Sequence, residues 1–181
     1  VRCGIGRNEQ YSLARVSLAA VKNGKHVLVE KPAARSRQEL DDVFAAAQEN
    51  GVELLIRSSQ DRRITEDETL RLWEYVTGQP TIGESTVNIG RNSDRDARSA
   101  QVQVRSVKVT LQPPSRSKAS RARPSLPAWA IHVIETDPPK GVVPIEWLLL
   151  TTVMTETLEE ASRRVRWYAI RWLIEMFHKV L

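Results

Sequence analysis

The sequence predicts an α/β fold: a strand–helix–strand (βαβ) unit, then a β-rich stretch and finally a terminal helix. Three observations predict this order. Two short apolar runs, at 26–30 and 52–56, flank a segment with helical spacing. Apolar and polar residues alternate at several places between Val87 and Leu111, as they do in half-buried strands. Residues 157–181 return to a helical period.

The first helix and the first strand are predicted in residues 11–30. The segment 11–23 is rich in alanine and leucine, and Gly24 stands where it can end a helix. Its apolar residues at helical spacing are Leu13, Val16, Ala20 and Val21. The run 26–30 is short and apolar, as buried strands are, and Pro32 ends it.

A second helix and a second strand follow. Ser36 and Glu39 have the spacing of a capping box ahead of a helix that runs to Asn50. Gly51 ends this helix, and the run 52–56 is the next apolar strand. Strand, helix and strand at this spacing predict a right-handed parallel βαβ unit.

A short helix precedes the β-rich stretch. Thr65 and Glu68 form another capping-box pair, and Gly78 ends the helix that they open. The apolar residues of this helix are Leu70, Leu72, Trp73 and Val76. The polar residues 90–98 that follow Ile89 are typical of the tip of a hairpin.

The strands of the β-rich stretch are predicted from alternation. Apolar residues stand at every second position in three sets: Val87 and Ile89; Val102 and Val104; Val107, Val109 and Leu111. The parity slips between Val104 and Val107, which predicts a β-bulge near Arg105 and Ser106. Two more strands are predicted at 129–134 and 147–153, separated by a turn around Pro138 and Pro139.

A basic, proline-rich loop is predicted at 113–127. It contains no acidic residue, and its basic residues are Arg116, Lys118, Arg121 and Arg123. Such a loop suits contacts with the phosphates of DNA. A solvated surface loop without a ligand is the alternative.

The terminal helix has a candidate site on one face. Thr157 and Glu160 form its capping box. Tyr168, Arg171 and Glu175 follow at offsets of three and four, so that they share a face. A carboxylate beside a guanidinium stays ionised and can hold a divalent cation, and the guanidinium can contact a phosphate. The alternative is a surface ion pair of little energetic value.

Composition narrows the classes of function. The net charge of +5 favours a polyanionic partner such as nucleic acid. A single cysteine, Cys3, excludes an internal disulfide and a site of several cysteine ligands, which predicts a cytoplasmic location. No apolar run is long enough to span a bilayer, so no membrane contact is expected.

Three blocks near the end of the chain carry a resemblance to a known family. They are Pro138-Pro139-Lys140-Gly141, Glu146-Trp147-Leu148-Leu149-Leu150-Thr151-Thr152 and Trp167-Tyr168-Ala169-Ile170-Arg171-Trp172-Leu173-Ile174-Glu175-Met176-Phe177-His178-Lys179. They resemble the carboxy-terminal catalytic segment of bacterial cut-and-paste insertion-sequence transposases. The family signature there is Tyr, two residues, Arg, three residues, Glu, six residues, Lys. Its first three positions match Tyr168, Arg171 and Glu175, and its Lys would follow Leu181 directly.

The resemblance extends upstream through Ile56-Arg57-Ser58-Ser59-Gln60-Asp61-Arg62-Arg63 and implies a transposase-like segment over residues 56–181. Its parts would be a β-rich insertion at about 80–153 and a catalytic-type helix at about 158–181. The implied architecture is a partial ribonuclease-H-like fold. Glu175 would be the third carboxylate of a metal-binding Asp, Asp, Glu triad that uses Mg²⁺ to cleave and join phosphodiesters.

The same resemblance implies DNA as the partner, with Tyr168 and Arg171 on its phosphates, and leaves a homodimer open as the assembly. The two aspartates of the triad would lie upstream of the segment that matches Arg57–Arg63, and nothing in this chain matches them. Asp61 belongs to the Gln-Asp-Arg-Arg block and is neither of the two. The transposase-like segment is therefore expected to be inactive alone.

Residues 1–55 carry a different resemblance. The run Asn23-Gly24-Lys25-His26-Val27-Leu28-Val29-Glu30-Lys31-Pro32 resembles the nicotinamide-dependent oxidoreductases of the Gfo/Idh/MocA family. In that family a lysine after the strand lies near the nicotinamide and the substrate, and Lys31 matches it. The glycine-rich phosphate loop of a Rossmann fold is not matched, because Gly4-Ile5-Gly6 has no third glycine and no preceding strand.

Three functions follow from these observations. The first is a truncated transposase-like protein that binds DNA and is inactive alone. The second is the remnant of a nicotinamide-dependent oxidoreductase. The third is a fused gene remnant without a selected function.

Overall fold

The computed structural model describes residues 13–25, 27, 36–58, 60–91, 96–113 and 122–170. The chain divides into two compact units. The helical unit comprises residues up to Leu54 together with the range Pro113–Leu126. The sheet unit comprises Leu55–Gln112 and Pro127–Leu181. Together they have the mixed α/β composition that the sequence predicts.

The helical unit is built on α1 (Leu13–Lys22) and α2 (Arg37–Glu49), which pack against each other. Ser36 caps α2 by accepting a hydrogen bond from the backbone N–H of Glu39, as the sequence predicts. Gly51 follows α2 with a φ of +62°, a conformation that favours glycine. The predicted strand 26–30 lies outside the described residues, apart from Val27.

The buried face of α1 differs in part from the predicted one. Val21 is buried as predicted, but Val16 is 56% exposed, and Ala14 and Ser17 are buried with Val21. These three positions also have helical spacing, so that the buried stripe is rotated around the helix. The small side chains Ala14 and Ser17 allow α1 to pack closely on α2. A search for strongly hydrophobic residues at helical spacing does not detect such small residues.

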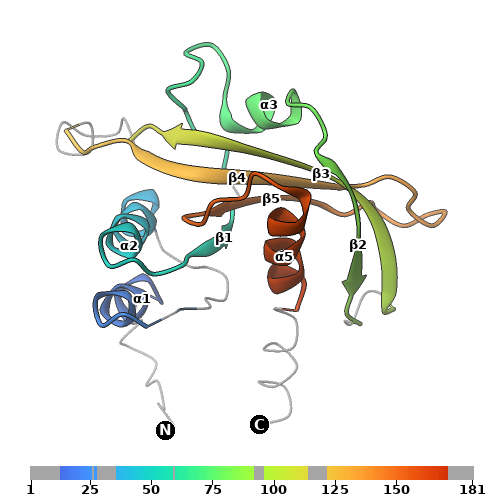
Figure 1. Cartoon of the computed structure of the whole chain (residues 1–181), viewed down its shortest axis with the longest axis horizontal. Helices are drawn as coiled ribbons and strands as arrows, with labels where there is room; N and C mark the ends of the chain where they lie inside the picture. Colours follow the sequence, from blue (N-terminus) through green and yellow to red (C-terminus); the bar gives the residue numbers. More distant parts are fainter. Residues whose placement is uncertain are drawn as a thin grey trace, which may run out of the picture. The chain divides into compact units, whose positions relative to one another are not determined.

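The sheet unit contains a five-stranded sheet in the order β1-β5-β4-β3-β2 (Figure 1). The strands are β1 (Leu55–Arg57), β2 (Gly83–Ile89), β3 (Arg98–Leu111), β4 (Leu126–Glu135) and β5 (Glu146–Thr151). Each pair whose register is defined is antiparallel: β1 with β5, β4 with β5, and β2 with β3. The hairpin β2–β3 is the one that alternation predicts.

β1 has a partner that the sequence analysis does not predict. The predicted βαβ unit would pair the strand at 52–56 in parallel with the strand at 26–30. The observed strand begins at Leu55 and pairs antiparallel with β5, with Ile56 opposite Leu150. Cross-strand pairing with β5, far along the chain, is invisible to local periodicity. A parallel neighbour at 26–30 stays a prediction.

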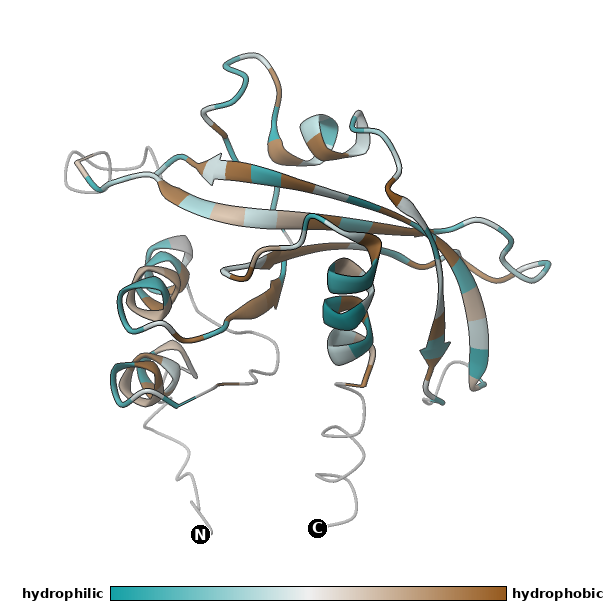
Figure 2. Cartoon of the chain, viewed as in Figure 1, coloured by the Kyte–Doolittle hydropathy of each residue, from teal (hydrophilic) through white to brown (hydrophobic). Residues whose placement is uncertain are grey.

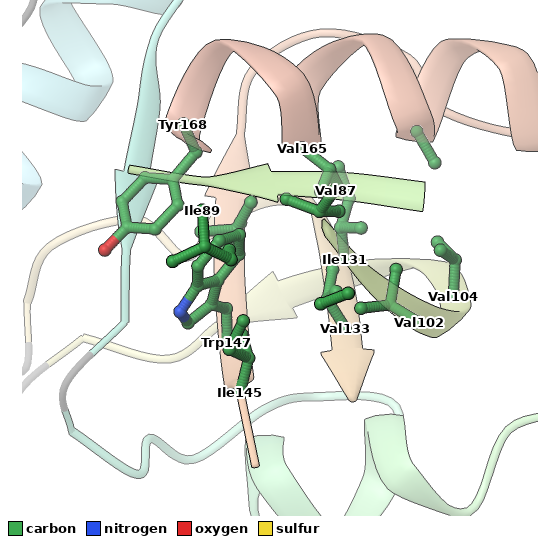
Figure 3. Close-up of a cluster of buried hydrophobic side chains, with 13 residues drawn as sticks. Val87, Ile89, Val102, Val104, Ile131, Val133, Ile145, Trp147, Val165 and Tyr168 are labelled. Atoms are coloured by element: carbon green, nitrogen blue, oxygen red, sulfur yellow. The ribbon is translucent and has the colours of Figure 1, made fainter. Parts of the chain in front are cut away.

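Two helices of the sheet unit cover opposite faces of the sheet (Figure 1). On one face, α5 (Leu158–Ala169) contacts β1, β2 and β3. It packs over an apolar cluster that includes Val102, Val104, Ile131, Val133 and Leu149 (Figure 3). On the other face, α3 (Leu72–Thr77) contacts β3, and the Trp73 ring meets the ring of His132 edge-on.

The change of covering helix explains the parity slip in β3. Val102 and Val104 face α5, whereas Val109 and Leu111 are buried at positions of the opposite parity. Hydrophobic and hydrophilic segments alternate along the strands of the sheet (Figure 2). Between Val104 and Val109 alternation continues: Arg105 donates to the backbone oxygen of Gln79 after α3, and Ser106 donates to that of Thr155 before α5. A strand that exchanges its buried face accounts for the parity slip, and the predicted bulge stays a prediction.

The start of α3 also differs from the prediction. Thr65 does not cap this helix, since its N–H donates to the backbone oxygen of Thr110. The helix begins seven residues later, and the backbone N–H of Trp73 donates to Asp61 Oδ1 at 3.0 Å. An aspartate distant in sequence takes the place of the capping residue.

The start of α5 is as predicted. Thr157 and Glu160 form a complete capping box, in which each side chain accepts a hydrogen bond from the other residue's backbone N–H. The carboxylate of Glu160 accepts hydrogen bonds from the backbone N–H and the hydroxyl of Thr157 and from the backbone N–H of Glu156, and these bonds hold its pKa below the usual value. Close packing fixes the helix against β2: a Cβ on Gly83, whose φ is +149°, would lie 2.6 Å from Leu158 Cδ2.

Candidate functional site

The structure describes two of the eight predicted site residues, Tyr168 and Arg123. The other six are Lys31, Arg116, Lys118, Arg121, Arg171 and Glu175, and they lie outside the described residues. The described α5 ends at Ala169, with Ile170 as its C-terminal cap. The shared face of Tyr168, Arg171 and Glu175 therefore stays a prediction.

Tyr168 belongs to the core of the sheet unit. Its residue is 8% exposed, and its ring meets Trp147 of β5 edge-on, with 4.9 Å between the ring centroids (Figure 3). An edge-to-face pair of this kind stabilises the packing of a helix on a sheet. The ring of Tyr168 therefore packs α5 on the sheet. Only the hydroxyl end of the side chain could contact DNA.

Arg123 forms an ion pair with Asp42 of α2 inside the helical unit. Their side chains are 32% and 40% exposed. A phosphate that approached Arg123 would therefore compete with a carboxylate already bound to its guanidinium.

The sheet unit contains a buried ion pair that local sequence patterns do not reveal. Arg98, at the start of β3, donates through both terminal nitrogens to the Glu135 carboxylate at the end of β4. The backbone N–H of Ile145 donates to the same carboxylate at 3.0 Å. The hydrogen bonds from Arg98 are the main reason that the pKa of Glu135 lies below its usual value, while burial opposes this shift.

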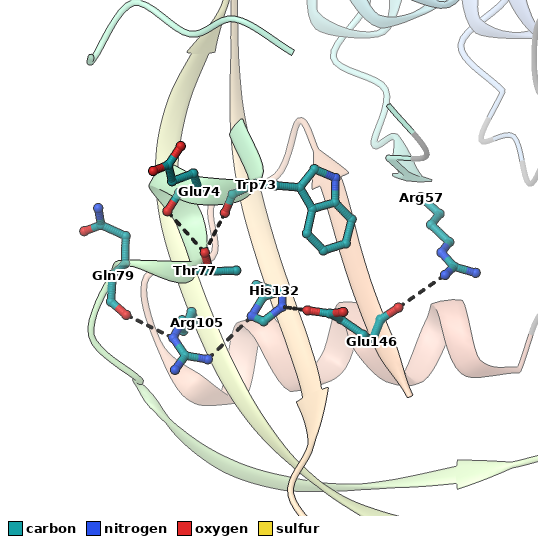
Figure 4. A network of polar contacts seen from close by, with 8 residues as sticks. All are labelled: Arg57, Trp73, Glu74, Thr77, Gln79, Arg105, His132 and Glu146. Carbon is teal, nitrogen blue, oxygen red and sulfur yellow. Dashed lines mark hydrogen bonds and ion pairs between the residues drawn. The ribbon is translucent and has the colours of Figure 1, made fainter. Parts of the chain in front are cut away.

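A second polar network lies on the sheet face that α3 covers (Figure 4). The Nε2 of His132 is 3.0 Å from Glu146 Oε1, and its Nδ1 is 3.5 Å from a terminal nitrogen of Arg105. These two contacts join Arg105 of β3, His132 of β4 and Glu146 of β5 into one network.

This second network has the features of a structural element. His132 is buried beneath Trp73, and Arg57 of β1 donates to the backbone oxygen of Glu146 (Figure 4). In the described part of the chain, no three His, Cys, Asp or Glu side chains come together as metal ligands. The described residues therefore offer no group of three such ligands that could hold Mg²⁺.

The outer surface of α5 gathers cationic and aromatic side chains. Arg163, Arg166, Trp167 and Ile170 are exposed there. The guanidinium of Arg164 lies over the Trp167 ring, 4.4 Å from its centroid. The sequence shows the residues but not their exposure, because which side of a helix packs on a sheet depends on the whole fold.

The segments that carry the transposase-like blocks are neighbours in the sheet unit. Ile56 pairs with Leu150 of the Trp-Leu-Leu-Leu-Thr block, and the backbone N–H of Ser58 donates to the oxygen of Leu148. The Asp61-Arg62-Arg63 segment lies beside α3 and the end of β3: Asp61 accepts from Trp73, and Arg62 donates to the oxygen of Gln112. Residues about ninety positions apart in sequence therefore form one substructure.

Among the described helices, none combines the length and the apolar character that crossing a membrane requires.

A comparison with protein families identifies part of the chain. Residues 9–58 match the Gfo/Idh/MocA model, described as an oxidoreductase family with an NAD-binding Rossmann fold. The match contains α1, α2 and β1, covers less than a third of the chain, and begins after Gly4-Ile5-Gly6. It confirms the resemblance of the first residues: this segment is similar to part of the NAD-binding domain of Gfo/Idh/MocA oxidoreductases.

Proposed function

We propose that residues 9–58 are the remnant of a nicotinamide-dependent oxidoreductase of the Gfo/Idh/MocA type, without a working dinucleotide site. The family match carries this proposal. A Rossmann fold binds the pyrophosphate at a glycine-rich turn between its first strand and helix. The matched residues contain no such turn, because the chain's one Gly-x-Gly sequence precedes them.

The expected result of a titration with NADH and NADPH is no saturable binding at micromolar cofactor. Cofactor fluorescence measures it directly on the whole chain. The matched control is the Lys31→Ala variant, which removes the lysine that the family resemblance places near the nicotinamide. Saturable binding that this variant abolishes would show that the segment has kept a cofactor site.

For the sheet unit we propose a second, distinct function: sequence-independent binding of DNA by a transposase-derived segment. The observation that favours it is the adjacency of the transposase-like blocks around β1 and β5. The ribonuclease-H-like architecture, the DNA contacts of Tyr168 and Arg171, and the Mg²⁺ site at Glu175 belong to this proposal. Because nothing in the chain matches the two catalytic aspartates, the segment binds DNA without cleaving it.

Duplex DNA binding is expected to weaken steeply as salt rises, because phosphate contacts release condensed counterions. Fluorescence anisotropy at several salt concentrations gives the slope of log affinity against log salt. Neutralising Arg116, Lys118 and Arg121 together is expected to reduce this slope by about 0.9 for each phosphate that the chain no longer neutralises. Arg123→Gln is the control with a smaller expected effect, because Asp42 already pairs with that guanidinium.

An affinity for duplex DNA that does not change with salt concentration would contradict the DNA proposal. If neither the cofactor nor DNA binds, the chain is a fused remnant whose activities belonged to its ancestors.

A further inference from the structure

We propose that the α5 face, defined as Arg163, Arg166, Trp167 and Ile170, binds single-stranded DNA by stacking a base on Trp167 and pairing phosphates with the arginines. The proposal rests on the DNA-binding function above and names the form of DNA that this surface takes. Its four residues are distinct from the DNA contacts predicted in the basic loop and at Tyr168, Arg171 and Glu175.

Trp167 is presented to solvent, unlike the other tryptophans that the structure describes. It is 42% exposed, whereas Trp147 is buried and Trp73 and Trp129 are half-buried. Arg164, one turn earlier, holds its guanidinium 4.4 Å from the ring centroid. A cation over the ring holds it in place, and a base can stack on the part of the ring that is exposed.

The charge around Trp167 suits a polyanion. Arg166 is exposed and has no ion-pair partner among the described residues. Arg163 pairs with Glu159 at 3.0 Å, but both side chains are more than half exposed, so that this pair is weak and screened by salt. The other acid of the first turn, Glu160, is held in the capping box.

The same charges favour nucleic acid over a second copy of the chain. Two copies that met through this face would bring their arginines together, and like charges across an interface oppose association. A single strand offers phosphates for the arginines and unpaired bases for the ring. A duplex offers the phosphates alone, because its bases are already stacked.

The test measures the affinity of the full chain for a labelled oligothymidylate and for a duplex of equal length. Trp167→Ala is expected to weaken single-strand binding about 10-fold, with Trp167→Phe in between, and to change duplex binding little. Arg166→Gln is expected to reduce the single-strand salt slope by about 0.7. Lys140→Gln, an exposed lysine in the β4–β5 turn, is the matched control for the loss of one charge.

Trp167 is exposed, so its variants keep the core, and unfolding by urea verifies this. If Trp167→Ala and Arg166→Gln bind the single strand as Lys140→Gln does, the inference is overturned and the duplex-binding function stands. If the unaltered chain binds neither DNA, both proposals are overturned. If Trp167→Ala alters only the sedimentation of the chain, the face is a protein interface and the inference is wrong.

Discussion

Replacing Glu135 with glutamine is expected to lower the free energy of unfolding of the sheet unit by about 3 kcal/mol at neutral pH. The Glu135 side chain is fully buried and that of Arg98 is 17% exposed. A buried arginine that loses its carboxylate keeps the desolvation penalty without the compensating attraction. The Nε of Arg98 already has no hydrogen-bond partner, so that its other nitrogens depend on Glu135. Urea unfolding followed by tryptophan fluorescence measures the loss.

The effect is expected to depend on pH. The folded-state pKa of Glu135 lies below its usual value of 4.5, because Arg98 and the Ile145 N–H bind the ionised form. The ionised carboxylate therefore stabilises the fold fully above pH 4.5, and this stabilisation is lost as the pH falls through the lower, folded-state pKa. The difference between the unaltered chain and Glu135→Gln should thus shrink in acid.

Two variants separate the ion pair from other effects. Glu84→Gln, on an exposed position of β2, is the matched control and should change stability little. The double variant R98M/E135L removes both charges, and it should lose less stability than Glu135→Gln alone. The Glu135→Gln variant should still lose some stability in acid. Part of this loss is expected from Asp67 and Glu160, whose pKa values are also lowered. A gap that stays constant from neutral pH into acid would contradict this account.

The features predicted correctly from sequence depend on neighbours a few residues apart. The Ser36 cap and the capping box at Thr157 each involve a residue three positions later, and both helices begin where these pairs predict. The hairpin β2–β3 follows from alternation on either side of a polar tip. Signals of this kind involve residues within one helical turn or one strand, so that all the residues involved can be recognised from the sequence.

The features that were missed depend on contacts between distant residues. The start of α3 is set by Asp61, twelve positions before the N–H that it accepts from. The ion pair of Arg98 and Glu135 joins residues 37 positions apart, and β1 finds its partner in β5. The change of buried face along β3 follows from two helices that cover opposite sides of the sheet. Periodicity reports that a face is buried but does not identify which element covers it.

The candidate site divides in the same way. The sequence singles out Tyr168 as one of three polar groups on a helix face, whereas the structure places its ring against Trp147. Trp167 has no motif of its own, and its exposure follows only from the orientation of α5 on the sheet. One residue of rotation around the helix separates a core side chain from a surface one.

Replacing Leu149 with alanine is expected to lower the free energy of unfolding of the sheet unit by about 3 to 4 kcal/mol. Leu149 is fully buried in β5, opposite Arg57 of β1 and Ile131 of β4, and it packs in the cluster beneath α5. The rigid sheet on both sides limits collapse into the space that the missing methyl groups leave. Val143→Ala, at a position 84% exposed in the β4–β5 turn, is the control with little expected effect.

The same experiment tests whether the two units unfold separately. All five tryptophans lie within the ranges of the sheet unit, so that tryptophan fluorescence and near-ultraviolet circular dichroism report on that unit. Leu149→Ala should lower the midpoint of this signal. Phe44→Ala, at a buried position of α2 in the helical unit, should instead lower the part of the far-ultraviolet signal that comes from α1 and α2. If both variants shift both signals equally, the chain unfolds as one cooperative body, and the two units depend on each other for stability.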